Sequence, residues 1–174
     1  MRPSETLTCT PEMFRMEENL RNIHLFRELD DQVLQELGVF TREIDYDRKQ
    51  YIFIEGQTRD TVYFLHTGTV RVFHVSSDGR ETIHQIVRSG QIFPQTGAFD
   101  LSVYPGTAET ITPCTILSTP RKKFEAWYIK NVSLLKDANK TMRAKFPHRG
   151  GARRPELPFY DSIERIVANS RSTS

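Results

Sequence analysis

Cysteine and long apolar runs are scarce in this 174-residue sequence. Its two cysteines, Cys9 and Cys114, are too few for a disulfide framework or for the four thiolates of a cubane iron–sulfur cluster. No apolar run approaches the roughly 18 residues that a membrane span requires. The first ten residues also lack the apolar block of a signal peptide. We therefore expect a cytoplasmic protein with reduced thiols and no membrane partner.

Catalytic motifs are missing as well. The sequence contains no nucleophile elbow, no Walker loop and no His-Glu-x-x-His pair, so we expect neither enzymatic activity nor a cofactor. The net charge of +2 indicates no particular class of partner.

Five histidines raise the alternative of a cupin-like metalloprotein, in which two or three histidines and a carboxylate converge inside a small β-barrel. His74 and His84 are the only two that flank one hairpin. If Asp78-Gly79 forms a two-residue turn, the strand register places the two rings on opposite faces of the sheet. This placement predicts no metal site.

The stretch from Tyr51 to Ala108 organises the chain. Short runs rich in Val, Ile, Phe and Tyr alternate with turn residues about every ten to twelve positions, and their apolar residues recur with the strand period of two. Four glycines separate these runs: Gly56, Gly68, Gly79 and Gly90. The pattern predicts a mainly β fold, a sandwich or barrel.

Helical patterns flank this stretch on both sides. Thr10 and Pro11 have the residue types of an N-cap and a first helical turn. Residues 25–40 show helical spacing, and so do the residues after Pro120. We expect a break near Asn131 to divide the last region into two helices.

Three motifs follow one another in the central stretch: Ile52-Phe53-Ile54-Glu55-Gly56, the strand pair from Tyr63 to Val72, and Asp78-Gly79-Arg80-Glu81. In this order they resemble the cyclic-nucleotide-binding sensor domain of the Crp/Fnr family of bacterial transcription regulators. The resemblance covers roughly residues 25–145. It implies a jelly-roll of the cyclic-nucleotide-binding type that senses an effector and pairs two subunits through a long helix.

The resemblance also divides the chain into four parts. They are an N-terminal arm (1–22), the β-roll (23–120), the C-terminal helices with a truncated dimerisation helix (121–146), and an irregular basic tail (147–174).

The resemblance places a phosphate-binding cassette, with the pattern Gly-x-x-Phe-Gly-Glu, at residues 90–95. In relatives that bind cyclic AMP, the Glu holds the ribose and an Arg of a following Arg-Ser/Thr-Ala segment pairs with the phosphate. Here Pro94 replaces the Gly, Gln95 the Glu, and Gly106 the Arg. A buried phosphate diester needs a positive partner, so we expect no useful binding of cyclic AMP.

The candidate pocket can still take an unknown, neutral or weakly polar effector, or be filled by its own side chains. Its residues are Phe93, Pro94, Gln95, Thr96, Gly97, Gly106, Thr107 and Ala108.

The dimerisation helix is predicted to start near Val132 and to stop before Pro147. Its apolar face would hold Leu134, Leu135, Ala138 and Met142. Because this helix is short, we expect a weak homodimer or a monomer.

The basic tail (147–174) shows no helix-turn-helix pattern, so DNA would be a partner only of an intact, longer form. We hypothesise that the tail is an out-of-frame translation, because a reading one base later admits the helix pattern that opens the family's DNA-binding half. Sequencing the gene past its 3′ end tests this. If the tail is native, the alternative is a stand-alone small-molecule-binding or protein-interaction module.

Overall fold

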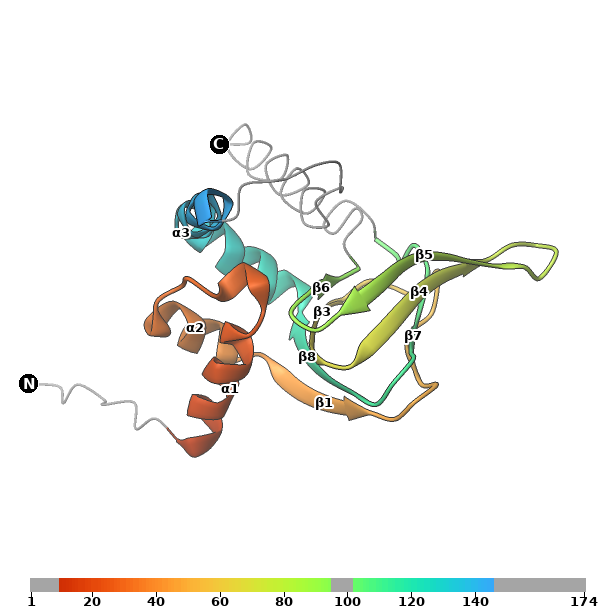
Figure 1. Ribbon diagram of the computed structural model, residues 1–174, viewed down its shortest axis with the longest axis horizontal. Coiled ribbons are helices and arrows are strands. Elements are labelled where there is room, and N and C mark those ends of the chain that lie inside the picture. The colour runs from red at the N-terminus through yellow and green to blue at the C-terminus, as the bar shows by residue number, and fades with distance from the viewer. Residues whose placement is uncertain (1–9, 95–101, 146–174) are drawn as a thin grey trace, which may run out of the picture.

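Two four-stranded antiparallel sheets form a β-roll in the computed structural model, which describes residues 10–94 and 102–145 (Figure 1). One sheet has the order β1-β8-β3-β6, and the other has the order β2-β7-β4-β5. The strands are β1 (Arg42–Tyr46), β2 (Tyr51–Phe53), β3 (Thr61–Thr67), β4 (Thr69–Val75), β5 (Glu81–Arg88), β6 (Ile92–Phe93), β7 (Thr107–Thr110) and β8 (Cys114–Pro120). The predicted mainly β jelly-roll with flanking helices is confirmed.

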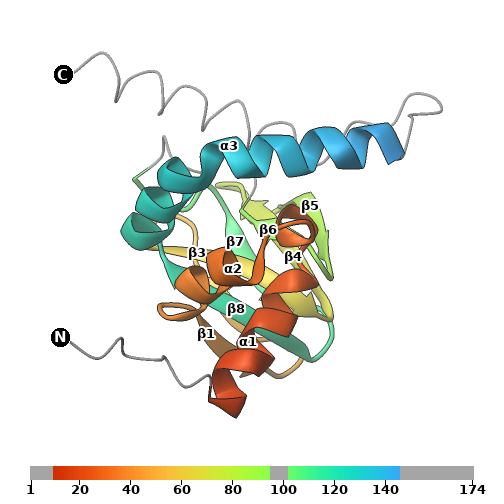
Figure 2. The ribbon, with the colours of Figure 1, turned by 90° about the vertical axis from the view of Figure 1, so that its left-hand side faces the viewer.

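The helices gather at one end of the roll, where α2 contacts both α1 and α3 (Figure 2). They are α1 (Pro11–Arg21), the short 3-10 helix η1 (His24–Phe26), α2 (Asp31–Gly38) and α3 (Arg121–Lys145). The Thr10 side chain accepts a hydrogen bond from the Met13 amide, as expected of an N-cap. None of the helices in the described part of the chain combines the length and apolarity needed to cross a membrane.

The helical region predicted at 25–40 is present as η1 and α2, with a turn between them and Asp30 as the N-cap of α2. The predicted break near Asn131 was wrong, because α3 runs without interruption from Arg121 to Lys145. The Asn131 side chain donates to the Trp127 carbonyl four residues earlier, so this polar group bonds within the helix and does not end it.

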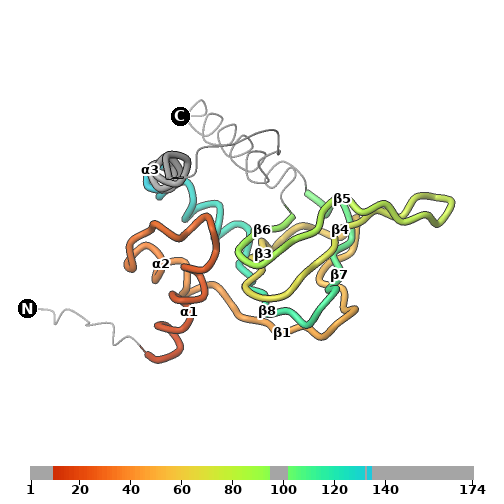
Figure 3. The backbone as a smooth tube through the Cα atoms, viewed as in Figure 1, coloured from red at the N-terminus to blue at the C-terminus, as the bar shows by residue number. Residues whose placement is uncertain are grey.

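The hairpin between β4 and β5 projects from the roll (Figure 3), and its turn differs from the predicted one. The Ser76 amide donates to the Arg80 carbonyl, which leaves three residues in the loop, with Gly79 at a φ of +82°. A register shift follows at Val72. The rings of His74 and His84 consequently lie 6.2 Å apart, so their assignment to opposite faces was wrong.

His74 also contacts a carboxylate, since its Nδ1 lies 2.7 Å from Glu55 Oε1. Across residues 10–94 and 102–145, no group of three or more His, Cys, Asp or Glu side chains is arranged to hold a metal ion.

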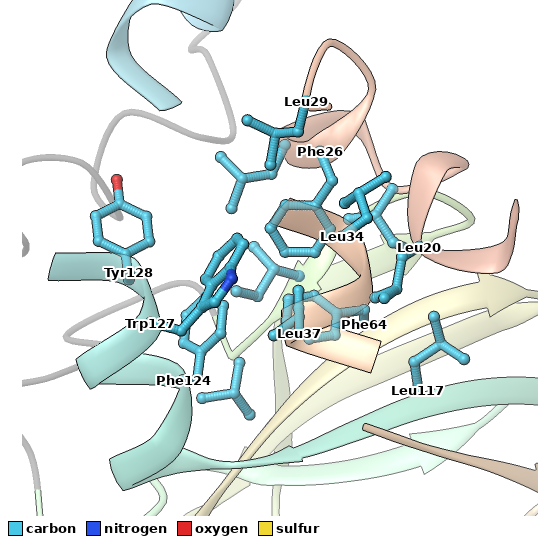
Figure 4. Close-up of a cluster of buried hydrophobic side chains, with 14 residues drawn as sticks. Leu20, Phe26, Leu29, Leu34, Leu37, Phe64, Leu117, Phe124, Trp127 and Tyr128 are labelled. Carbon is cyan, nitrogen blue, oxygen red and sulfur yellow. The ribbon is translucent and has the colours of Figure 1, made fainter. Parts of the chain in front are cut away.

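Buried side chains form two clusters that share the sheet containing β3. The helical cluster joins the helices to one face of this sheet, and it includes Phe26, Phe64 and Trp127 (Figure 4). The roll cluster fills the space between the two sheets, and it includes Phe53 and Phe93. Successive residues of β3 therefore serve different clusters, because side chains alternate along a strand.

Candidate functional site

The cassette segment begins at the end of β6 and returns to the roll at β7. Phe93 is fully buried at the end of β6, and Pro94 after it is also buried. Gln95, Thr96 and Gly97 lie outside the described residues. The chain is described again from Ser102, and an isolated bridge pairs Val103 with Thr58.

Aromatic rings fill the interior beside Phe93. Phe53 stacks on Tyr104 with a centroid distance of 4.0 Å and an angle of 10° between the rings. Tyr63 stacks on Phe93 at 5.6 Å. Tyr104 is only 3% exposed, and its hydroxyl donates to the Thr61 carbonyl. These stacked rings form the described wall beside Phe93.

The position at which the resemblance expects an arginine is crowded. A Cβ added at Gly106 would lie 3.0 Å from the Phe73 carbonyl oxygen and 3.3 Å from Val72 Cγ1. Contacts of a Cβ atom in proteins are seldom this short, so β4 leaves little room for a side chain at position 106. The glycine fits this close approach between two segments of backbone.

The next two predicted residues are part of the sheet. Thr107 is 8% exposed, and its hydroxyl accepts a hydrogen bond of 3.1 Å from the Glu55 amide. Ala108 is fully buried, pairs with Val72 of β4 and belongs to the roll cluster together with Phe93. The structure thus brings Phe93 and Ala108 into one cluster.

A buried arginine that the sequence does not indicate lies beside Pro94. Arg59 is 3% exposed, and its Nη2 donates to the Pro94 carbonyl at 3.3 Å. Burial, followed by the neighbouring charge of Arg121, lowers the pKa of Arg59 to about 10. At neutral pH it is therefore a charged group in the interior. An arginine in a polar turn normally indicates exposure, and the sequence carries no signal to the contrary.

Arg59 and Asp60 connect the cassette to the start of α3. The Arg59 amide donates to the Ser102 carbonyl at 2.9 Å, at the point where the described chain resumes after Pro94. On the helix side, the Arg121 amide donates to the Asp60 carbonyl at 2.8 Å, and Arg121 Nη1 donates to the Arg59 carbonyl at 3.3 Å. A chain of hydrogen bonds thus connects Pro94 and Ser102, which lie on either side of residues 95–101, to the first turn of α3.

Burial also governs the tyrosines of this interior. It raises the pKa of Tyr63 well above the ordinary value of 10.0, and the neighbouring Tyr104 adds to the effect. The pKa of Tyr104 is raised as well, again chiefly by burial. Both phenols stay neutral at physiological pH, so the described wall of the site offers aromatic surface and hydroxyl groups.

The predicted dimer face is described only at Leu134, which lies on α3 and is 45% exposed. The side chains of Leu135, Ala138 and Met142 lie outside the described part.

A model of the cyclic nucleotide-binding domain family matches residues 43–131, about half of the chain. The CRP-like cAMP-activated global transcriptional regulator of Mycobacterium tuberculosis is 26% identical over 112 residues, which are 64% of this chain and 50% of that protein. The chain thus spans about half the length of the curated relatives it matches.

Several solved structures share the fold. The sensor domain of the transcriptional regulator DNR from Pseudomonas aeruginosa superposes with a TM-score of 0.63 at 20% identity, covering 82% of this chain and 98% of that one. The N-terminal domain of a transcriptional regulator from Streptomyces coelicolor gives 0.57 at 22% identity, covering 89% and 94%. The regulatory subunit of a cAMP-independent protein kinase A from Trypanosoma brucei gives 0.62 at 18% identity, covering 87% and 53%.

Proposed function

The chain belongs to the cyclic nucleotide-binding domain family, and from that premise we propose that it senses a small-molecule effector other than cyclic AMP. In this proposal it is the effector domain of a Crp/Fnr-type transcription regulator. Effector binding at the cassette changes the position of α3, and α3 carries the change to the rest of the regulator.

The main support for expecting no cyclic AMP binding is the residue at position 106. Gly106 occupies the place of the phosphate-binding arginine, and its backbone lies so close to Phe73 that a side chain has little room. Pro94 supports the exclusion, because a proline in the cassette removes one backbone N–H from the phosphate cradle.

The test is a calorimetric titration of the purified chain with cyclic AMP. We expect no heat of binding in the micromolar range. A thermal melt gives a second reading, because a ligand at a hundred times its Kd raises the free energy of unfolding by about 2.7 kcal/mol. Cyclic AMP at about 1 mM should therefore leave the melting temperature unchanged.

The cAMP-activated regulator of Mycobacterium tuberculosis is the positive control in both measurements. Circular dichroism of the chain must show folded β-structure, so that a missing signal is not a folding defect. A micromolar Kd for cyclic AMP would overturn the proposal.

A further inference from the structure

A groove of about 500 Å³ opens where α2 ends, β1 begins and β8 continues into α3, a junction that can be followed in Figure 1. None of its residues belongs to the cassette segment. Its walls include Phe40, Arg42, Thr61, Ser118, Pro120 and Lys123. The volume lies within the range of small-molecule sites.

Two positive charges flank this groove. Arg42 is the first residue of β1 and Lys123 lies in the first turn of α3, and both are exposed. Neither forms a salt bridge with a carboxylate in the described part of the chain. The neighbouring cations differ, because Arg121 is paired with Glu125 and Lys130 with Glu36.

None of the described residues that line the groove carries a carboxylate. The nearby Asp60 already accepts a hydrogen bond of 2.9 Å from the Thr61 hydroxyl, and the Ser118 hydroxyl makes only a long bond of 3.4 Å to the Arg42 carbonyl. Two unpaired cations and a weakly bonded hydroxyl therefore face one cavity, and this combination favours an anionic ligand.

The remaining wall is apolar. The Phe40 ring is half-buried, its centroid lies 5.9 Å from Lys123 Nζ, and Pro120 is exposed beside it. We propose that this groove binds a small organic anion, with its phosphate or carboxylate between Arg42 and Lys123 and a flat apolar body against Phe40 and Pro120.

Such a ligand would bridge the roll and α3. Arg42 belongs to β1, whereas Lys123 belongs to α3. The start of α3 is also connected to the cassette by the hydrogen bond between the Arg121 amide and the Asp60 carbonyl. A bound anion would hold the first turn of α3 against β1. The groove is thus a second input to α3, separate from the cassette.

Phenyl phosphate is a suitable probe because it combines a flat ring with a phosphate group. We expect calorimetry to give a Kd of roughly 0.1 to 1 mM at low salt, rising with ionic strength. Trp127, the only tryptophan, lies one turn beyond Lys123 and provides a fluorescence signal. Lys123→Ala and Arg42→Ala should each raise the Kd about tenfold, since each removes one charge-assisted contact.

Lys122→Ala is the matched control. Lys122 is an equally exposed cation next to Lys123, but it does not line the groove, so this variant should keep the Kd of the unaltered chain. Phenol and inorganic phosphate, each with half of the probe's chemistry, should bind more weakly. Gln95→Ala should have no effect, because position 95 belongs to the cassette.

Several results would overturn the proposal. One is the absence of phenyl phosphate binding up to about 10 mM. Another is an equal loss of affinity in Lys122→Ala and Lys123→Ala, which would indicate nonspecific attraction to the basic surface. A loss in Gln95→Ala would place the ligand in the cassette. Circular dichroism of each variant excludes unfolding, and none of these results depends on whether cyclic AMP binds.

Discussion

Four buried or half-buried acidic groups should make the folded protein sensitive to alkaline pH. Burial raises the pKa values of Tyr46, Tyr63 and Tyr104 above their ordinary value of 10.0, and that of Cys114 above 9.0. The folded state keeps these protons where the unfolded chain has lost them. The contribution of these groups to the free energy of unfolding is therefore complete below about pH 9. It is lost as the pH rises through the folded-state pKa values. Arg59 has the opposite effect on the pH dependence of the free energy of unfolding, because its pKa is lowered in the folded state.

We predict that the free energy of unfolding falls between about pH 9 and pH 10.5. Urea denaturation at a series of pH values measures it. Tyr63→Phe and Tyr104→Phe should each reduce the slope, because phenylalanine has no proton to lose. An unchanged slope in both variants would assign the alkaline loss to other groups.

Gly106 provides a second test at the scale of one residue. Gly106→Ala should destabilise the protein by about 1 to 3 kcal/mol, because the added methyl group meets the Phe73 carbonyl and Val72. Gly38→Ala is the control: its new Cβ would have Met16 Cγ as nearest neighbour at 3.4 Å, an ordinary contact. Urea denaturation of the two variants compares them, and equal stabilities would contradict the crowding at position 106.

Residue identities indicated part of the candidate site before the structure did. The replacements at positions 94, 95 and 106, which we interpret as lost anchors, are visible in the sequence, because the family resemblance aligns the motifs around them. The burial of Arg59 is not visible, since it depends on β6 and on Ser102, which are distant in the sequence. The crowding at Gly106 likewise arises from β4, a strand more than thirty residues earlier.

Among the elements, α3 is attached to η1 and α2 by its aromatic first turns. Trp127 is 4% exposed, packs edge-on against Phe26 at 5.6 Å, and donates its indole N–H to the Val33 carbonyl. Trp127→Ala should cost about 3 to 5 kcal/mol, because it leaves a large cavity in the helical cluster.

Urea denaturation tests this attachment of α3. Ile129→Ala, on the same helix at a residue that is 39% exposed, should cost less than about 1 kcal/mol. If both variants unfold at the same urea concentration, α3 contributes little to the stability of the described fold.

The sequence predicted those elements whose position follows from the periodicity of apolar residues. It did not predict features that depend on the length of a single turn or on a single side chain. Alternating apolar residues located the strands of the roll, since burial on a sheet requires that period. The turn at Ser76 has three loop residues, and this single extra residue changed the pairing of His74 and His84. α3 continues through Asn131, whose side chain donates to the Trp127 carbonyl, a bond that spacing does not reveal.

At the scale of the whole molecule, association is the main open prediction. We propose a weak homodimer or a monomer, with Leu134 on the face that pairs. Sedimentation over a concentration series should give a dimer Kd above about 1 µM, and Leu134→Glu should weaken association further. A nanomolar dimer, or one unaffected by Leu134→Glu, would contradict this model.

Both faces of the sheet that contains β3 are buried at its centre. Val62 and Phe64 belong to the helical cluster, whereas Leu65 of the same strand belongs to the roll cluster, and Leu117 and Ile116 of β8 divide in the same way. The helices and the roll therefore have one wall in common, and neither can loosen while the other keeps its packing. The described chain should melt as one cooperative unit, with the backbone amides of β3 among the last to exchange with solvent deuterium.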